Sequence, residues 1–206
     1  MSELNLNTQE LQASYGIGLQ MGEQLRAQPF EGLDISAVAA GIADAFAGAE
    51  SKVSQQELQE AFQTISARMQ VAAEEQAKIL GAAGAEFLAE NAKKEGVQVT
   101  ASGLQFEVIT QGEGEIPTAE STVSVHYHGT LVDGTVFDSS VERGQPAEFP
   151  VGGVIAGWTE ALQLMPVGSK YKLTIPAELA YGERGAGAAI GPHSTLAFEV
   201  ELLAIK

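Results

Sequence analysis

GVIAGWTEALQLMPVGS, residues 153–169, is the stretch around which the second half of this chain is organised. It predicts a short helix between glycine-containing turns, with the single tryptophan, Trp158, in its first turn. Ala161, Leu162 and Met165 follow Trp158 at helical spacing and continue one face. Strand-like segments flank this run on both sides. We expect the lone helix to pack across one face of a sheet, so that its start forms the floor of an apolar pocket.

The composition limits the classes of protein to which the chain can belong. Of the 206 residues, 45% are hydrophobic, which is enough for a core, and the formal net charge is −16. Both halves are acidic: residues 1–100 carry 14 acids and 6 bases, and residues 101–206 carry 13 and 5. The lack of a basic patch argues against nucleic acid or an anionic membrane as a partner. With no cysteine, the chain forms neither disulfides nor thiolate metal sites.

The N-terminal sequence MSELNLNTQELQ is polar. It has no basic segment followed by an apolar one, so it predicts no secretory signal. No apolar run approaches the roughly 18–20 residues that a membrane-spanning helix needs. We therefore expect a cytoplasmic protein that does not span a membrane.

Residues 1–96 are predicted to form a helical domain rich in alanine, glutamine and glutamate. A first helix is expected over residues 8–27 with Asn7 as N-cap, and a second over residues 34–46 with Asp34 as N-cap. Glycines inside a helix indicate a kink or a close approach to another helix. We favour close packing for the three glycines of the first helix, Gly16, Gly18 and Gly22.

A third, unusually long helix is predicted over residues 54–95. Ser54 and Glu57 form a capping box at its start, and Gly96 follows its end. About 40 residues at 1.5 Å each give roughly 60 Å. We expect one continuous arm, and the alternative is two helices with a break near residues 81–84. The first part is amphipathic, with one apolar face formed by Leu58, Phe62, Ile65 and Met69.

The first two helices and the start of the third form a small unit. Roughly 60 residues are marginal for a core that is stable by itself. We expect dimerisation through this region to complete the core. The alternative is a small monomeric cap of three helices.

Residues 97–206 are predicted to form a compact β domain, because alternating apolar segments replace the helical pattern near Val97. An Asp-Gly pair at residues 133–134 signals a hairpin, and short connections indicate a mainly antiparallel sheet. With one helix on its face, this domain is of the α+β class. The expected strands cover residues 97–99, 104–108, 122–130, 148–151, 170–175 and 195–205.

The polar motifs give no evidence for bond-making chemistry. His126 and His128 alternate on a strand and face the same side, but no third metal ligand accompanies them. No G-x-S-x-G nucleophile motif occurs. The glycine-rich run at residues 182–187 does not follow a strand and open a helix, so phosphate binding is not expected. We expect neither a metal nor a cofactor.

A set of apolar side chains at the loop edges remains. Apolar residues of this kind most often belong to an ordinary hydrophobic core. The alternative is an apolar binding pocket with a few polar groups. The set consists of Tyr127, Phe137, Phe149, Val154, Ile155, Trp158, Tyr181, Ile190 and Phe198.

Seven ordered blocks within residues 115–206 form a specific pattern: Val125-His126-Tyr127, Gly129-Thr130-Leu131, Asp133 to Ser140 (DGTVFDSS), Arg143-Gly144-Gln145-Pro146, Val154 to Trp158 (VIAGW), Leu179 to Gly182 (LAYG) and Thr195 to Leu202 (TLAFEVEL). Together they resemble the FKBP family of peptidyl-prolyl cis-trans isomerases, which also bind tacrolimus and rapamycin. The helical first half and the junction at residues 91–106 are similar to the bacterial two-domain branch, with its Mip-like and FklB-like proteins. The resemblance implies a V-shaped homodimer joined through residues 1–70, acting on proline-containing unfolded or partly folded proteins.

Carried over by position, the resemblance makes Trp158 the pocket floor and surrounds it with apolar walls. The Tyr181 hydroxyl and the Ile155 N–H would donate to a substrate carbonyl, and Asp138 at the edge would pair with Arg143. The residues assigned to catalysis are Tyr127, Phe137, Asp138, Trp158, Tyr181 and Phe198. Those assigned to substrate binding are Arg143, Phe149, Val154, Ile155 and Ile190.

The chain departs from better-known family members at the pocket rim. Ala147, Ala186 and Ala189 replace larger residues, and Gly191-Pro192 stands where Pro-Pro is frequent. The rim is therefore less bulky, which bears on drug affinity and substrate preference more than on activity. The expected function is isomerisation of X–Pro bonds with chaperone-like client binding by the dimer. The alternative is a chaperone or binding module whose isomerase pocket is secondary.

Overall fold

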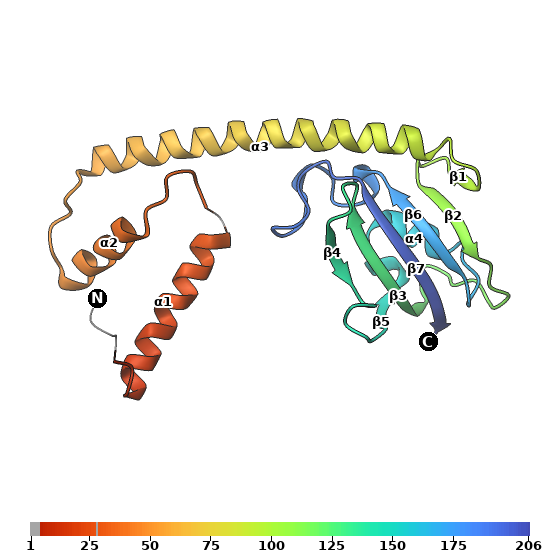
Figure 1. The fold of residues 1–206 in the computed structure, drawn as a ribbon, viewed down its shortest axis with the longest axis horizontal. Coiled ribbons are helices and arrows are strands. Elements are labelled where there is room, and N and C mark those ends of the chain that lie inside the picture. The colour runs from red at the N-terminus through yellow and green to blue at the C-terminus, as the bar shows by residue number, and fades with distance from the viewer. Residues whose placement is uncertain (1–4, 28) are drawn as a thin grey trace. The chain divides into compact units, whose positions relative to one another are not determined.

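The computed structural model describes residues 5–27 and 29–206. Residues 1–4 and 28 belong to the predicted helical domain and lie outside the described residues. The chain divides into two compact units, Met1–Ala72 and Ala73–Lys206. Figure 1 labels the helices and strands of both units.

Helix α1 spans Gln9–Ala27. The Leu11 N–H donates to Thr8 Oγ1 at 3.3 Å, so Thr8 rather than Asn7 satisfies a donor of its first turn. The prediction that the α1 glycines pack closely against another helix is not met within the described chain. A Cβ built on any of the three meets no atom within 4 Å, which holds for Gly16, Gly18 and Gly22.

Helix α2 spans Ile35–Ala47 and is capped at both ends as predicted. Asp34 Oδ1 accepts from the N–H groups of Ser36 and Ala37 at 2.7 and 3.1 Å. Gly48, with φ of 65°, ends the helix in the left-handed conformation that glycine favours. No described residue of α1 or α2 is buried.

Helix α3 spans Gln55–Asn91 without interruption, so the prediction of one continuous helix is confirmed and the break near residues 81–84 is wrong. The capping box forms as expected: the Ser54 N–H donates to Glu57 Oε2 at 2.9 Å, and the Glu57 N–H donates to Ser54 Oγ at 3.3 Å. The helix ends four residues before the predicted Glu95. Tighter turns follow, with the Lys94 N–H bonded to the Asn91 carbonyl at 3.1 Å.

The unit boundary inside α3 differs from the domain boundary predicted at residues 96 and 97. Composition changes near Val97 because the chain there passes from helix to strand. The C-terminal half of α3 nevertheless packs with the sheet that follows it, and Gly84 and Asn91 are the buried residues of the helix. The second compact unit therefore contains this half-helix as well as the β domain.

The sheet of the second unit has seven antiparallel strands among the described residues, as the predicted α+β class requires. Its order is β1-β2-β6-β7-β3-β4, and β5 pairs with the first part of β3. The long strands β3 and β7 lie side by side at its centre (Figure 1). The strands are β1 Val97–Val99, β2 Gln105–Thr110, β3 Thr122–Leu131, β4 Val136–Ser139, β5 Ala147–Pro150, β6 Lys170–Ile175 and β7 Leu196–Ile205.

Helix α4, Ala156–Leu162, packs on one face of this sheet and buries Gly157, Trp158, Ala161 and Leu162. Gly157 allows this close approach, because a Cβ there would lie 2.5 Å from Ile175 Cγ2 on β6. Three short 3₁₀ helices complete the unit, at Val151–Gly153, Ala177–Leu179 and Gly182–Arg184. Within the described residues, no helix combines the length and apolar character that crossing a membrane requires.

Candidate functional site

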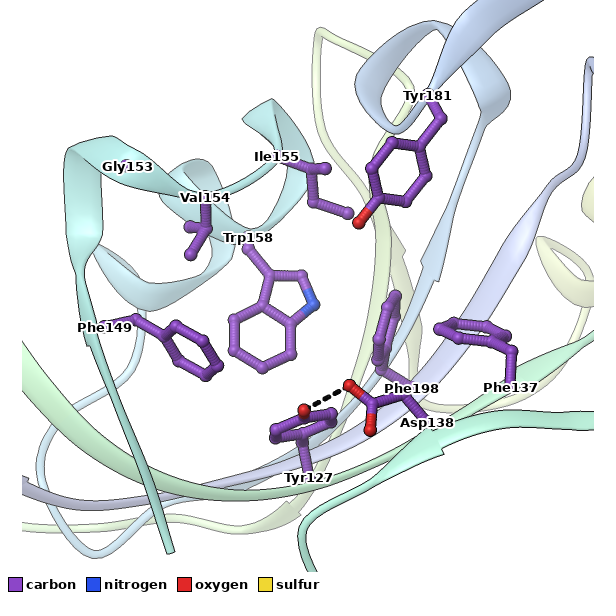
Figure 2. Close-up of a pocket in the computed structure, with 10 residues that line it drawn as sticks. All are labelled: Tyr127, Phe137, Asp138, Phe149, Gly153, Val154, Ile155, Trp158, Tyr181 and Phe198. Carbon is purple, nitrogen blue, oxygen red and sulfur yellow. Dashed lines mark hydrogen bonds between the residues drawn. The ribbon is translucent and has the colours of Figure 1, made fainter. Parts of the chain in front are cut away.

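A pocket of about 460 Å³ opens between α4 and the central strands, within the size range of small-ligand sites. Its lining comes from β3, β4, β5, β7, the start of α4 and the turn after β6, so distant segments meet there. Figure 2 shows these side chains surrounding one space. The lining residues are Tyr127, Phe137, Asp138, Phe149, Gly153, Val154, Ile155, Trp158, Tyr181 and Phe198.

Trp158 forms one side of this space and is only 4% exposed. Its ring meets those of Tyr127, Phe149 and Phe198 edge-on, with centroid distances of 5.4, 5.8 and 5.3 Å. Such edge-to-face pairs are the favoured aromatic geometry and hold the rings in place. The buried indole Nε1 has no hydrogen-bond partner among the described residues.

Two glycines shape the pocket, and the sequence reading did not assign either to the site. A Cβ on Gly129 of β3 would lie 2.7 Å from Phe137 Cζ and 2.8 Å from Phe198 Cε1. Only glycine therefore leaves room for this edge-on ring pair, whose centroids are 5.4 Å apart. Gly153 lines the pocket directly. The sequence signal for both is a glycine where the strand or turn pattern would accept a side chain.

A polar network of Tyr127, Asp138 and Arg143 lies at the pocket edge. The Tyr127 hydroxyl donates to Asp138 Oδ2, and the Arg143 guanidinium binds the other carboxylate oxygen. Arg143 also donates to the Tyr127 hydroxyl oxygen at 2.8 Å and lies 5.6 Å from the centre of the Tyr127 ring. The three hydrogen bonds together fix the direction of the Asp138 carboxylate.

The network shifts the ionisation of its members. Partial burial opposes ionisation of Asp138, but hydrogen bonds from Tyr127 and Arg143 outweigh it and lower the pKa of Asp138. Burial and the bond to Asp138 raise the pKa of Tyr127. The bonds to Asp138 and Tyr127 raise the pKa of Arg143. At neutral pH the site therefore holds a carboxylate, a guanidinium and a neutral phenol.

The lowered pKa of Asp138 predicts a pH-dependent part of the stability. It is present above the unfolded pKa of about 3.9 and is lost as pH falls through the lower folded value. We expect Asp138→Asn to lower the free energy of unfolding at pH 7 by up to about 1 kcal/mol, since the pair is partly exposed. The difference should shrink at pH 3. Urea unfolding followed by Trp158 fluorescence measures both values.

The neighbouring substitution Glu142→Gln removes the same charge outside the network and controls for net charge. If Asp138→Asn destabilises the protein equally at pH 3 and pH 7, its effect comes from packing and the electrostatic explanation is wrong.

Two hydrogen-bond donors of the pocket are available to a ligand. The hydroxyl of Tyr181, a residue that is 41% exposed, bonds to no other described residue and points toward the pocket in Figure 2. The Ile155 N–H, just before α4, has no acceptor within the described part of the chain. Both donors lie among the pocket-lining residues, so a carbonyl group bound there can accept from them.

The structure places nine of the eleven predicted site residues in the pocket lining, and the other two, Arg143 and Ile190, are not part of it. Arg143 acts through its bonds to Asp138 and Tyr127 rather than by lining the pocket. Ile190 is 8% exposed and belongs to the hydrophobic core that also contains Trp158.

The two strand histidines have structural partners. His126 Nδ1 lies 3.2 Å from Ser140 Oγ, and His128 Nδ1 lies 3.0 Å from Ser139 Oγ. They alternate with Tyr127 on β3 and so face the opposite side of the sheet from the pocket. The described residues contain no cluster of three or more histidine or carboxylate side chains placed to bind a metal.

Comparison with known proteins relates both halves of the chain to one group. The model of the FKBP-type peptidyl-prolyl cis-trans isomerase domain matches residues 113–203, and that of the domain amino-terminal to it matches residues 10–108. The FKBP-type 22 kDa peptidyl-prolyl cis-trans isomerase of Escherichia coli K12 is 58% identical over 205 residues, with both chains fully covered. The Escherichia coli isomerase FkpA is 40% identical, covering 100% of this chain and 79% of its own. The crystal structure of FkpA superposes with a TM-score of 0.69 over 97% of this chain and 98% of that one.

Proposed function

This chain belongs to the family of FKBP-type peptidyl-prolyl cis-trans isomerases, and we propose that it accelerates X–Pro isomerisation in folding proteins with the pocket around Trp158. The observation that carries the assignment of the site is the ring of aromatic side chains from separate elements, with free donors at its edge. This arrangement suits the apolar pyrrolidine ring of proline and the carbonyl that precedes it.

The chemistry follows from the nature of the barrier. Rotation about an X–Pro bond crosses about 20 kcal/mol, because the amide loses conjugation as it twists. The twisted amide is less dipolar than the planar one, so a dry apolar pocket favours it relative to water. No covalent bond is made or broken. The reaction therefore needs no nucleophile or general base.

The polar groups of the pocket orient the substrate amide. The Tyr181 hydroxyl and the Ile155 N–H donate to the substrate carbonyl, which holds one side of the amide while the proline ring turns. Asp138, held by Tyr127 and Arg143, presents a negatively charged group to the pocket. None of these groups exchanges a proton with the substrate.

A peptide assay tests this function. We expect the full chain to accelerate cis-to-trans conversion of a short X–Pro peptide in proportion to its concentration, and tacrolimus to compete with the peptide. Ala147, Ala186 and Ala189 make the rim smaller, which is expected to weaken drug binding more than catalysis. Absence of acceleration contradicts the proposed function; acceleration that tacrolimus leaves unchanged contradicts only the proposed drug site.

We further propose that the chain forms a homodimer through residues 1–70 and holds a partly folded client at two pockets. Support comes from the large apolar side chains of the first unit, many of which are exposed in a single chain: Phe46 is 95% exposed, Phe62 70% and Ile35 62%. Monomeric proteins rarely leave so much apolar surface in water. Two linked pockets raise the apparent affinity for one client without new contacts.

A further inference from the structure

The C-terminal half of α3 lies unusually close to the strand that carries Phe198. Gly84 is buried against Thr195, which directly precedes β7 and is 4% exposed. A Cβ on Gly84 would lie 2.5 Å from Thr195 Oγ1 and 3.1 Å from Thr195 Cβ. The helix backbone therefore rests on the sheet unit with no side chain between them.

A buried polar cluster fixes the last turn of the same helix. Asn91 Nδ2 donates to Gln105 Oε1 at 2.9 Å and to Thr174 Oγ1 at 3.2 Å. Gln105 Nε2 donates to the Leu88 carbonyl at 2.9 Å. Asn91, Gln105 and Thr174 are 7%, 5% and 2% exposed, so breaking these bonds would leave polar groups buried without partners. These contacts anchor α3 to β2 and β6.

The anchored helix contacts the segment of residues 182–193, which we call the rim loop. A Cβ on Gly191 would lie 2.5 Å from Leu80 Cδ1, so the Leu80 side chain rests directly on the loop backbone. At the next residue of the helix, a Cβ on Gly81 would lie 3.6 Å from His193 Cβ. Figure 1 shows the chain leading into β7 beneath this part of α3.

The rim loop in turn adjoins the pocket residue Tyr181 and contributes Ile190 to the core. The His193 N–H donates to the Gly182 carbonyl at 2.8 Å and ties the two ends of the loop together, next to Tyr181. His193 does so with φ of 55°, the single positive value among described residues other than glycine. Within the loop, Ala186 and Ile190 exchange two backbone bonds of 2.8 and 3.1 Å. Ile190 packs into the core beside the pocket.

We propose that Leu80 is a positioning residue of the isomerase: by holding the rim loop in place it positions Tyr181 at the pocket and Ile190 in the core beside it. The segment of α3 from Ala73 to Asn91 is then a working part of the isomerase unit rather than a connector. This inference rests on the proposed function of the pocket. It assigns no substrate contact to Leu80, which acts only through the loop.

The test compares Leu80→Ala with Ile79→Ala in the full chain. Ile79 is the adjacent residue, has a side chain of equal volume and is 57% exposed, so it is the matched control. We expect Leu80→Ala to raise KM for a short X–Pro peptide about three- to tenfold and to change kcat less than twofold. The aromatic pocket that favours the twisted amide stays in place, while a group that holds the peptide moves. Ile79→Ala should leave both constants unchanged.

A rescue variant and a stability measurement separate positioning from general destabilisation. Leu80→Met conserves volume and should return KM to within twofold of the original. An unchanged KM in Leu80→Ala overturns the proposal, as does a fall in kcat that tracks a lower melting temperature while KM stays constant. If the unmodified chain does not accelerate isomerisation, the proposed function itself fails. The positioning role alone fails when the unmodified chain is active and Leu80→Ala matches it.

Discussion

Replacing Trp158 by alanine is expected to lower kcat/KM for a short X–Pro peptide at least tenfold. Trp158 is in edge-on contact with Tyr127, Phe149 and Phe198. Its loss removes one wall of the pocket and leaves these three rings without the side chain that holds them in place. Each such contact is worth about 0.5–1.5 kcal/mol. A contact of similar strength between the Trp158 ring and the proline ring in the transition state, worth about 1.4 kcal/mol, gives a tenfold change in rate when it is lost.

Two comparisons make the Trp158 prediction specific. Alanine leaves a large cavity, which costs about 3–5 kcal/mol of stability, so Trp158→Leu is measured beside it as an apolar replacement of intermediate size. We expect a smaller loss for leucine than for alanine, with far-ultraviolet circular dichroism showing that both variants are folded. His126→Ala and His128→Ala change the other face of the sheet and should each cost less than about threefold. Losses at the histidines equal to that at Trp158 would contradict a mechanism based on the apolar pocket.

Local sequence patterns predicted the elements well, and they failed where a distant contact decides. The alternation of residues 170–175 and the capping residues Asp34 and Ser54 are local signals, and the structure follows them. The end of α3 was misplaced by four residues. Asn91 is drawn into a buried cluster with Gln105 and Thr174, which are 14 and 83 positions away, and nothing in the helical pattern encodes that.

The division of the chain into two compact units, which falls inside α3, could not be predicted from composition. Composition distinguishes helix from strand, so it changes near Val97. Composition does not show which of the two compact units a helical residue packs in. Gly81 and Gly84 weakened the predicted helix, but Gly84 also lets the helix approach Thr195, which directly precedes β7. In the sequence Gly84 therefore indicates a possible helix break, whereas in the structure it is the point where the helix backbone packs on Thr195.

The pocket was predicted through family resemblance rather than through the pattern of residues. Base rates alone favoured ordinary core for its aromatic residues, and Trp158, Tyr127 and Phe198 are indeed members of the core cluster. What distinguishes them is that their rings also face one open space. Gly129 was not assigned to the site, because a glycine in a strand does not by itself indicate that its missing side chain makes room for Phe137.

Replacing Phe62 by glutamate is expected to convert the proposed dimer into a monomer. Phe62 is 70% exposed in the single chain and shares one face of α3 with Leu58, Ile65 and Met69, which we call the α3 stripe. If the α3 stripe forms the dimer core, each glutamate places an unpaired charge in an apolar contact at a cost of several kcal/mol. A twofold interface contains the substitution twice. The dimer dissociation constant should therefore rise at least about a hundredfold.

Solution mass from light scattering measures this change, with twice the chain mass of 21.5 kDa expected for the original protein and the single mass for Phe62→Glu. Thr64→Glu adds the same charge at an exposed position of α3 outside the α3 stripe and should leave the dimer intact. Per-chain activity on a short peptide should stay within twofold in both variants, because the pocket belongs to the unit Ala73–Lys206. Acceleration of a proline-limited protein refolding reaction should fall severalfold in Phe62→Glu alone, since a monomer offers one pocket to each client. A Phe62→Glu protein that keeps the double mass places the interface elsewhere. One that becomes monomeric and refolds clients at the original rate shows that pairing of the pockets has no part in client capture.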